Sequence, residues 1–293
     1  MSINYSLIEE TVKNLYIKAL KIAPPDLVIA LKKAYDSETS DLAKRILQTI
    51  LSNVQTAKDR DMLICQDTGT PVYFVKIGSN LCINGIKLYE AICNGTKRAT
   101  LEHPIRPNIV HPITRINTGT NVGNNIPVIH YEFFDGDYLA IMCMPKGSGS
   151  ENMSFMSMLL PADGIAGIKK FVIDAVIESG GKPCPPTVIG VGIGGTSDLV
   201  TLLAKKALIR PVGSHNPDPQ IARLENELYE AINSTGIGPM GMGGKNTCLA
   251  VHIESAYTHI SHNPVAINTQ CWAARRAGAK IYTNGEVEEV WEI

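Results

Sequence analysis

Residues 187–208, TVIGVGIGGTSDLVTLLAKKAL, decide how this chain folds. A short apolar run predicts a strand, the glycines after it predict a turn, and TSDLVTLLAKKAL repeats apolar residues at helical spacing. On both sides the chain continues as short strands and helices without strict alternation. This mixture predicts an α/β or α+β fold, with mixed sheets flanked by helices rather than a regular doubly wound sheet.

Residues 1–60 carry helical periodicity that Pro24 and Pro25 interrupt, and from Met62 onward the texture becomes β-rich. We therefore expect a helical N-terminal segment at 1–60 and a domain at 61–293, together one structural unit with a bilobed form left open. The strands expected next are MLIC (62–65), PVYFVKIG (71–78), VIHYEFF (128–134) and YLAIMCM (138–144). The later helices are expected at 151–160, 164–181 and 223–236, the later strands at 248–254 and 265–269, and a hairpin around Asn284 and Gly285.

Composition excludes several classes of protein. The 293 residues are 44% hydrophobic and 19% charged, an ordinary globular balance. The 27 basic and 28 acidic residues give a net charge of -1, which argues against nucleic acid or an anionic membrane as partner. The longest apolar runs are too short to span a bilayer, and MSINYSLIEE lacks the features of a signal peptide. We expect a cytoplasmic protein that binds small molecules or other proteins.

Cysteine usage carries the most chemical information. Seven cysteines without a secretion signal favour free thiols or metal ligands. Three of them lie in different kinds of loop, namely Cys65 in ICQDTG, Cys184 in KPCPP and Cys271 in TQCWAARR. Three thiolates can hold an iron–sulfur cluster and leave one iron open as a Lewis acid for carboxylate substrates. Each also has a purely structural alternative: an Asx turn, a proline-stiffened connection and a thiol buried after a strand, respectively.

The other four cysteines, Cys82, Cys93, Cys143 and Cys248, lie in apolar or helical surroundings. We expect them to be small packed hydrophobes, as free cysteines usually are.

Several other polar residues are candidates for chemistry. Asp67 precedes a glycine that can adopt positive φ, and Arg106 in HPIRPNIV has the shape of a bidentate carboxylate anchor. His252, His259 and His262 invite a zinc hypothesis, but their spacing matches no standard zinc motif. His259, in a polar loop, is the best candidate for proton transfer because imidazole titrates near neutral pH.

Two glycine-rich turns have competing interpretations. GVGIGG (190–195) fits the G-x-G-x-x-G dinucleotide pattern, but no acidic residue ends a strand about 20 residues later. We expect its glycines to allow close packing instead. KGSGSEN (146–152) is either an amide-rich clamp for a carboxylate or simply a capped helix start.

Taken together, seven stretches resemble the α subunit of the class I, iron–sulfur-dependent fumarate hydratases and the related tartrate dehydratases. The match runs in one order from about residue 60 to 280, through CQDTGTPVYFVKIG, KGSGSENMSFMSMLLP, CPPTVIGVGIGGTSD, IRPVGSHNP, GIGPMGMGGKNT, VHIESAYTHIS and QCWAARR.

The resemblance implies a [4Fe-4S] cluster on Cys65, Cys184 and Cys271, so that 61–293 is an iron–sulfur hydro-lyase α-type domain. It further implies catalytic roles for Asp67 and His259. Contacts with substrate are implied for Gln66, Arg106 and the turn formed by Gly147, Ser148 and Gly149. Ser148 stands where the family pattern has Gly or Ala, which alters the expected turn.

The resemblance also implies that the chain works with a β-type subunit, because nothing after residue 280 resembles the domain that carries the threonine base. The expected assembly is a heterotetramer containing a dimer of this chain, and the expected reaction is reversible hydration of fumarate to L-malate. Alternatives are a dehydratase subunit for tartrate or a substituted fumarate such as mesaconate, and a non-catalytic iron–sulfur sensor or assembly subunit.

Overall fold

The computed structural model describes residues 3–293, which form two compact units. Among the described residues, unit 1 comprises 3–24, 54–147 and 275–293, and unit 2 comprises 25–53 and 148–274. The change from one unit to the other after Asn53 falls within helix α3 (Asp41–Asp59). These units are defined by contacts and not by composition, so the predicted limit at residue 60 stays a prediction.

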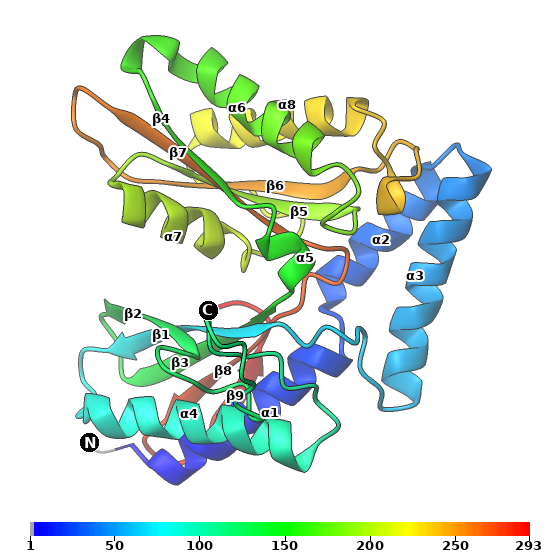
Figure 1. Cartoon of the computed structure of the whole chain (residues 1–293). Coiled ribbons are helices and arrows are strands. Elements are labelled where there is room, and N and C mark those ends of the chain that lie inside the picture. Colours follow the sequence, from blue (N-terminus) through cyan, green and yellow to red (C-terminus); the bar gives the residue numbers. More distant parts are fainter. Residues whose placement is uncertain (1–2) are drawn as a thin grey trace. The chain divides into compact units, whose positions relative to one another are not determined.

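Unit 1 is built on a five-stranded mixed sheet in the order β2-β1-β3-β8-β9 (Figure 1). Its strands are β1 (Thr70–Gly78), β2 (Val128–Phe134), β3 (Tyr138–Lys146), β8 (Ala277–Tyr282) and β9 (Val287–Val290). Only β1 and β2 pair in parallel, and the other neighbours are antiparallel. The sheet thus confirms three predicted strands and the hairpin around Asn284 and Gly285.

Helices α1 (Tyr5–Lys21) and α4 (Gly85–Glu102) pack against each other and cover one face of this sheet. Their apolar residues recur at helical spacing and, together with one side of β1, β3 and β8, form a single buried core. Asn4 and Asn84 cap the two helices by accepting backbone N–H bonds through their side chains. The core therefore lies between these two helices and one face of the sheet.

Unit 2 is a three-layer arrangement around a four-stranded sheet in the order β4-β7-β5-β6. The strands are β4 (Phe155–Leu159), β5 (Thr187–Ile193), β6 (Cys248–Ser255) and β7 (Asn263–Gln270). Helices α6 (Gly164–Ser179) and α8 (Pro219–Ser234) cover one face, and α7 (Ser197–Ala207) covers the other. β5 runs parallel to β6 and antiparallel to β7, so the predicted mixture of strand directions is confirmed.

Glycines in β5 permit the close approach of α7. A Cβ atom on Gly190 would lie 2.1 Å from the carbonyl oxygen of Ala204, and one on Gly192 would lie 2.1 Å from that of Val200. Neither position can hold a side chain without separating the helix from the strand. The expectation that GVGIGG serves close packing is confirmed.

Helix α2 (Pro25–Ser37) belongs to unit 2 and is hydrogen-bonded to the rest of that unit near both of its ends. Near its start, Asp26 Oδ2 accepts the backbone N–H of Val212 at 2.7 Å. Just beyond its end, Glu38 accepts the N–H of Lys245 and the side-chain amide of Asn246, both at 2.9 Å. Burial raises the pKa of Glu38, but the hydrogen bonds from Asn246, Ser40, Thr39 and Lys245 outweigh it and hold that pKa below its usual value.

Three expectations were wrong. MLIC (62–65) is not a strand but the start of the loop before β1. The predicted helix at 151–160 is instead the end of the short helix α5 (Ser148–Glu151) followed by β4, in which exposed and half-buried residues alternate as an edge strand requires. Cys82 is exposed in the connection between β1 and α4, whereas a packed thiol was expected there.

Within residues 3–293, no helix combines the length and apolar character needed to cross a membrane.

Candidate functional site

The loop CQDTG precedes β1 in unit 1 and is folded by local hydrogen bonds. Asp67 Oδ1 accepts the N–H of Gly69 at 2.9 Å, which closes an Asx turn. Gly69 has φ of +73°, and a Cβ there would lie 2.8 Å from the backbone of Lys146. The predicted glycine with positive φ is thus confirmed, and it brings the loop against the end of β3.

Two buried side chains donate hydrogen bonds to the backbone of the CQDTG loop. The Arg275 guanidinium donates to the backbone carbonyl of Asp67, and the Tyr16 hydroxyl donates to that of Thr68 at 3.4 Å. Burial raises the pKa of Tyr16 well above its usual value, so its phenol keeps the proton that it donates. Cys65 and Asp67 are only partly covered and Gln66 is exposed, so the top of the loop faces solvent within unit 1.

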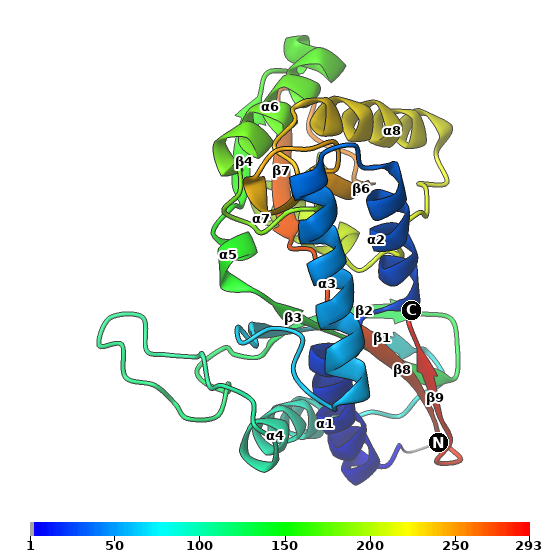
Figure 2. The same ribbon diagram turned by 90° about the vertical axis from the view of Figure 1, so that its right-hand side faces the viewer.

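Arg106 lies beside the same loop, at the start of the long irregular segment between α4 and β2 that Figure 2 shows. Its Nη2 atom is 4.0 Å from Asp67 Oδ1, and its side chain is 54% exposed. Unit 1 therefore brings together Cys65, Gln66, Asp67 and Arg106, four of the predicted site residues, around one loop.

Cys184 and Cys271 meet at one end of the sheet in unit 2. Cys184 precedes β5 and Cys271 follows β7, and because these strands are antiparallel the two positions are adjacent. The N–H of Trp272 donates to the carbonyl of Cys184 at 3.1 Å, which joins the two loops directly. Cys184 has φ of +58°, an uncommon conformation for a residue with a side chain, and its N–H bonds to Gly181.

The KGSGSEN turn crosses from one unit to the other, with Lys146 and Gly147 in unit 1 and the remainder in unit 2. Ser148 and Gly149 begin the short helix α5 and are exposed. A Cβ on Gly149 would lie 3.3 Å from the carbonyl oxygen of Lys182, two residues before Cys184. Gly149 of the predicted carboxylate-binding turn therefore lies beside the Cys184 loop in unit 2.

The three histidines do not form a metal site. His252 is buried in β6 with Nδ1 3.2 Å from the carbonyl oxygen of Ala207, whereas His259 and His262 stack with ring centroids 5.3 Å apart. Among residues 3–293, no three histidine, cysteine or acidic side chains group so as to hold a metal ion. His252 is thus buried within β6, apart from the stacked pair formed by His259 and His262.

His259 lies far from the two cysteines of unit 2. It belongs to the exposed loop that joins β6 to β7, at the end of the sheet opposite Cys184 and Cys271. β7 has 8 residues, which at about 3.3 Å each separate its two ends by roughly 25 Å. Its Nδ1 is 2.8 Å from Ser261 Oγ. The sheet does not bring His259 together with Cys184 and Cys271, and its predicted catalytic role stays a prediction.

The three cysteines proposed for an iron–sulfur cluster are accessible, as are Cys82 and Cys93, whereas the other two are buried. Cys65, Cys184 and Cys271 lie in loops, are partly exposed and form no disulfide, and thiolates are the soft ligands that iron–sulfur clusters take. Cys143 and Cys248 are fully buried, and burial raises the pKa of both thiols, so they stay protonated as predicted for packed residues. Burial also raises the pKa of Cys93.

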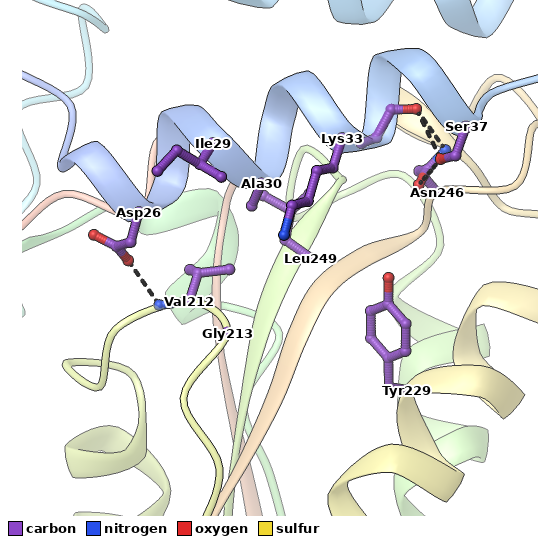
Figure 3. Close-up of a pocket in the computed structure, with 11 residues that line it drawn as sticks. Asp26, Ile29, Ala30, Lys33, Ser37, Val212, Gly213, Tyr229, Asn246 and Leu249 are labelled. Carbon is purple, nitrogen blue, oxygen red and sulfur yellow. Dashed lines mark hydrogen bonds between the residues drawn. The ribbon is translucent and has the colours of Figure 1, made fainter.

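A pocket of about 390 Å³ lies under α2 in unit 2, where Lys33 of α2 and Tyr229 of α8 point into it beside Val212 and Leu249 (Figure 3). None of the predicted site residues lines this pocket. It is therefore separate from the candidate site.

Sequence reasoning missed the buried supports of the site. Tyr16 lies in α1, far away in sequence, and Lys146 is 1% exposed although it opens a turn that reads as surface. Asn108 and Asn121 contact the Arg106 loop, but nothing in a single sequence distinguishes them from other loop asparagines. The one available signal is the turn-rich context TGTNVGN around Asn121, which is compatible with the positive φ of 56° that this asparagine adopts.

Comparison with known proteins defines the class of protein. A family model described as fumarate hydratase (Fumerase) matches residues 9–280, and the chain belongs to this family. This membership confirms the predicted resemblance and the predicted enzyme class, a hydro-lyase.

Individual relatives are similar over nearly their whole length. The chain is 49% identical over 277 residues to "Putative L(+)-tartrate dehydratase subunit alpha" of Methanocaldococcus jannaschii, covering 94% of this chain and 97% of that protein. It is 37% identical over 262 residues to L(+)-tartrate dehydratase subunit alpha of Escherichia coli strain K12, covering 89% and 86%, respectively. The protein of that name from Shigella sonnei gives the same values.

Proposed function

We propose that this chain is the cluster-binding α subunit of a hydro-lyase that removes water reversibly from a hydroxy-dicarboxylate. The observation that carries the proposal is the junction of Cys184 with Cys271 through the Trp272 hydrogen bond. This junction places two partly exposed cysteines at one end of the four-stranded sheet. Cys65, on the loop that also bears Asp67, would supply the third thiolate.

The residues that would hold a [4Fe-4S] cluster are Cys65, Cys184 and Cys271. When bound, a cluster with three protein thiolates supplies a Lewis-acidic iron that favours loss or addition of a hydroxyl group. The protein contributes the rest of the chemistry, which is binding, orientation and proton transfer at the neighbouring carbon.

Arg106 would anchor one substrate carboxylate, since a guanidinium matches a carboxylate in shape and charge. Gln66, at the exposed top of the same loop, would donate a hydrogen bond, and the backbone amides of Gly147, Ser148 and Gly149 would receive the second carboxylate. Asp67 would position or activate the group that moves the proton. Ser148 and Gly149 are exposed in unit 2, which supports access of a substrate to that part of the turn.

The names of the relatives favour L(+)-tartrate as the substrate, since proteins at 49% and 37% identity are named as tartrate dehydratase α subunits. The sequence interpretation favoured fumarate, and the family description supports it as the second candidate. Dehydration of L(+)-tartrate and dehydration of L-malate, the reverse of fumarate hydration, both eliminate water across adjacent carbons of a four-carbon diacid. L(+)-Tartrate carries one hydroxyl group more than L-malate, and a site can distinguish the two strongly when it hydrogen-bonds that group.

A β-type subunit would complete the active site. The relatives are named as α subunits, which supports the existence of a partner subunit. By the family resemblance, that partner would supply the base and further cationic groups.

The test is to produce the chain anaerobically with its candidate β subunit, reconstitute it with iron and sulfide, and assay L(+)-tartrate, L-malate, fumarate and mesaconate in parallel. The proposal expects turnover of at least one hydroxy-diacid that depends on both subunits, with L(+)-tartrate preferred. Iron incorporation without turnover of any diacid would favour the sensor or assembly alternative and refute the proposal.

A further inference from the structure

We propose that Thr68 and Asn108 are positioning residues that fix the guanidinium of Arg106 relative to Asp67. The inference rests on the proposed role of Arg106 as a carboxylate anchor. The inference adds a way in which a short series of hydrogen bonds sets the distance between Arg106 and Asp67.

Asn108 holds the side chain of Arg106 directly. Its Oδ1 accepts the Nε–H of Arg106 at 2.7 Å, and its Nδ2 donates to Thr68 Oγ1 at 2.6 Å. The Thr68 hydroxyl in turn donates to the backbone carbonyl of Arg106 at 2.6 Å. Thr68 is thus bonded both to the main chain of Arg106 and to the residue that orients its side chain.

Asn121 supports the same loop from beneath. It is fully buried, its Oδ1 accepts the N–H of Asn108 at 2.6 Å, and its Nδ2 donates to the carbonyl of Arg106 at 3.0 Å. The remaining Nδ2 hydrogen reaches Thr100 Oγ1 in α4 at 3.3 Å. The irregular segment is therefore pinned to a regular helix at the point where Arg106 leaves it.

These bonds determine which part of the guanidinium stays available. Because Nε is engaged by Asn108, Arg106 presents its two terminal amino groups, and a carboxylate would be received at that end. A carboxylate cannot use the side formed by Nε and one terminal amino group without displacing Asn108. The anchor therefore has one orientation rather than two.

Thr68 also ties this orientation to Asp67, its neighbour in the chain. Thr68 is fully buried and Arg106 Nη2 lies 4.0 Å from Asp67 Oδ1, so a shift of the Arg106 loop changes that distance. Misplacement of a binding group by about 1 Å can cost on the order of 100-fold in rate. The buried hydrogen bond from Thr68 to the main chain of Arg106 is the feature that prevents such a misplacement of Arg106 relative to Asp67.

The test compares Thr68→Val with Thr68→Ser in the full chain assembled with its β subunit. Valine keeps the shape of threonine but removes the hydroxyl, whereas serine keeps the hydroxyl. We expect Thr68→Val to lower kcat/KM by about 10-fold or more, mainly through a higher KM for the diacid, because a neutral hydrogen-bonded pin is lost. Thr68→Ser should stay within about 3-fold of wild type.

A second readout needs no activity. In the chain carrying Thr68→Val, released Arg106 should react faster with phenylglyoxal than in the wild-type chain or the Thr68→Ser chain, as measured by peptide mass spectrometry. Asn108→Ala removes the acceptor of Nε directly from a partly exposed position, and it should raise this reactivity even if Thr68→Val fails to fold.

Arg106→Lys separates the two levels of the proposal. If Arg106→Lys leaves KM unchanged, the proposed anchor is wrong. If Arg106→Lys raises KM but Thr68→Val and Asn108→Ala alter neither KM nor phenylglyoxal reactivity, the anchor stands and the positioning role is overturned.

Discussion

Replacing Asp67 by asparagine separates chemistry from folding at the candidate site. Asparagine keeps Oδ1, which accepts the Gly69 N–H at 2.9 Å, so the Asx turn before β1 stays closed. The change removes only the negative charge. That charge lies 4.0 Å from an Arg106 side chain that is 54% exposed, and exposed pairs of this kind contribute about 1 kcal/mol or less to stability.

The effect on turnover should be much larger. If Asp67 positions or activates the group that moves the proton, losing its charge removes a general acid–base contribution of about 100-fold or more. That loss corresponds to roughly 2.7 kcal/mol in the activation barrier, well above the expected change in the free energy of unfolding.

The assay measures turnover of the preferred diacid by the reconstituted enzyme, together with iron content and thermal unfolding. The matched control is Asp36→Asn, which changes an exposed aspartate of α2. The expected pattern is unchanged iron content, nearly unchanged unfolding and strongly reduced kcat. Wild-type turnover by the Asp67→Asn enzyme would refute the role of Asp67, and equal loss of iron and turnover would show that the effect is structural.

Two further predictions concern stability. Glu38→Gln should lower the free energy of unfolding by about 3 kcal/mol at neutral pH, since Glu38 is 2% exposed and accepts hydrogen bonds from four donors. The control Glu230→Gln, at an exposed position of α8, should change the free energy of unfolding by less than about 0.5 kcal/mol. The folded-state pKa of Glu38 is lowered, so the stability that its carboxylate contributes is complete above the unfolded pKa of about 4.3 and is lost as the pH falls through the folded-state pKa. Denaturant titrations should therefore show the stability difference between wild type and Glu38→Gln shrinking below about pH 4. A stability difference independent of pH would contradict this. Gly190→Ala should cost about 1–3 kcal/mol or more, since its Cβ would lie 2.1 Å from the Ala204 carbonyl oxygen, whereas Gly85→Ala, with nothing within 4 Å, should be close to neutral. Equal denaturation midpoints for the two alanine variants would count against this packing argument.

Local patterns predicted the elements of this fold well where one periodicity dominated. The β5–α7 stretch combines an apolar run, glycines and an amphipathic helix, and all three features point to the same structure. The segment 151–160 failed because its methionines and leucines suit a helix as well as an edge strand. Pairing of Phe155–Leu159 with β7 decides the outcome there, and pairing depends on residues more than 100 positions away.

The candidate site was predictable at the level of reactive residues but not of their supports. Cys184 and Cys271 stood out by residue type and loop context, and their adjacency follows from the antiparallel pairing of β5 with β7. The hydrogen bonds that orient Arg106 join Thr68 to residues 38 and 40 positions later. Such contacts produce no periodic sequence pattern from which they could be predicted, because they depend on how the segment between α4 and β2 folds back on the CQDTG loop.

The most direct test of the central claim is the iron and sulfide content of single cysteine variants after anaerobic reconstitution with the β subunit. Cys82→Ser is the matched control, because Cys82 is an exposed free thiol outside the proposed ligand set. We predict about four irons per chain in the wild-type and Cys82→Ser proteins, and loss of most iron and of the visible absorption in Cys65→Ser, Cys184→Ser and Cys271→Ser. Full iron incorporation in any one of these three variants would contradict the claim that these cysteines together hold the cluster.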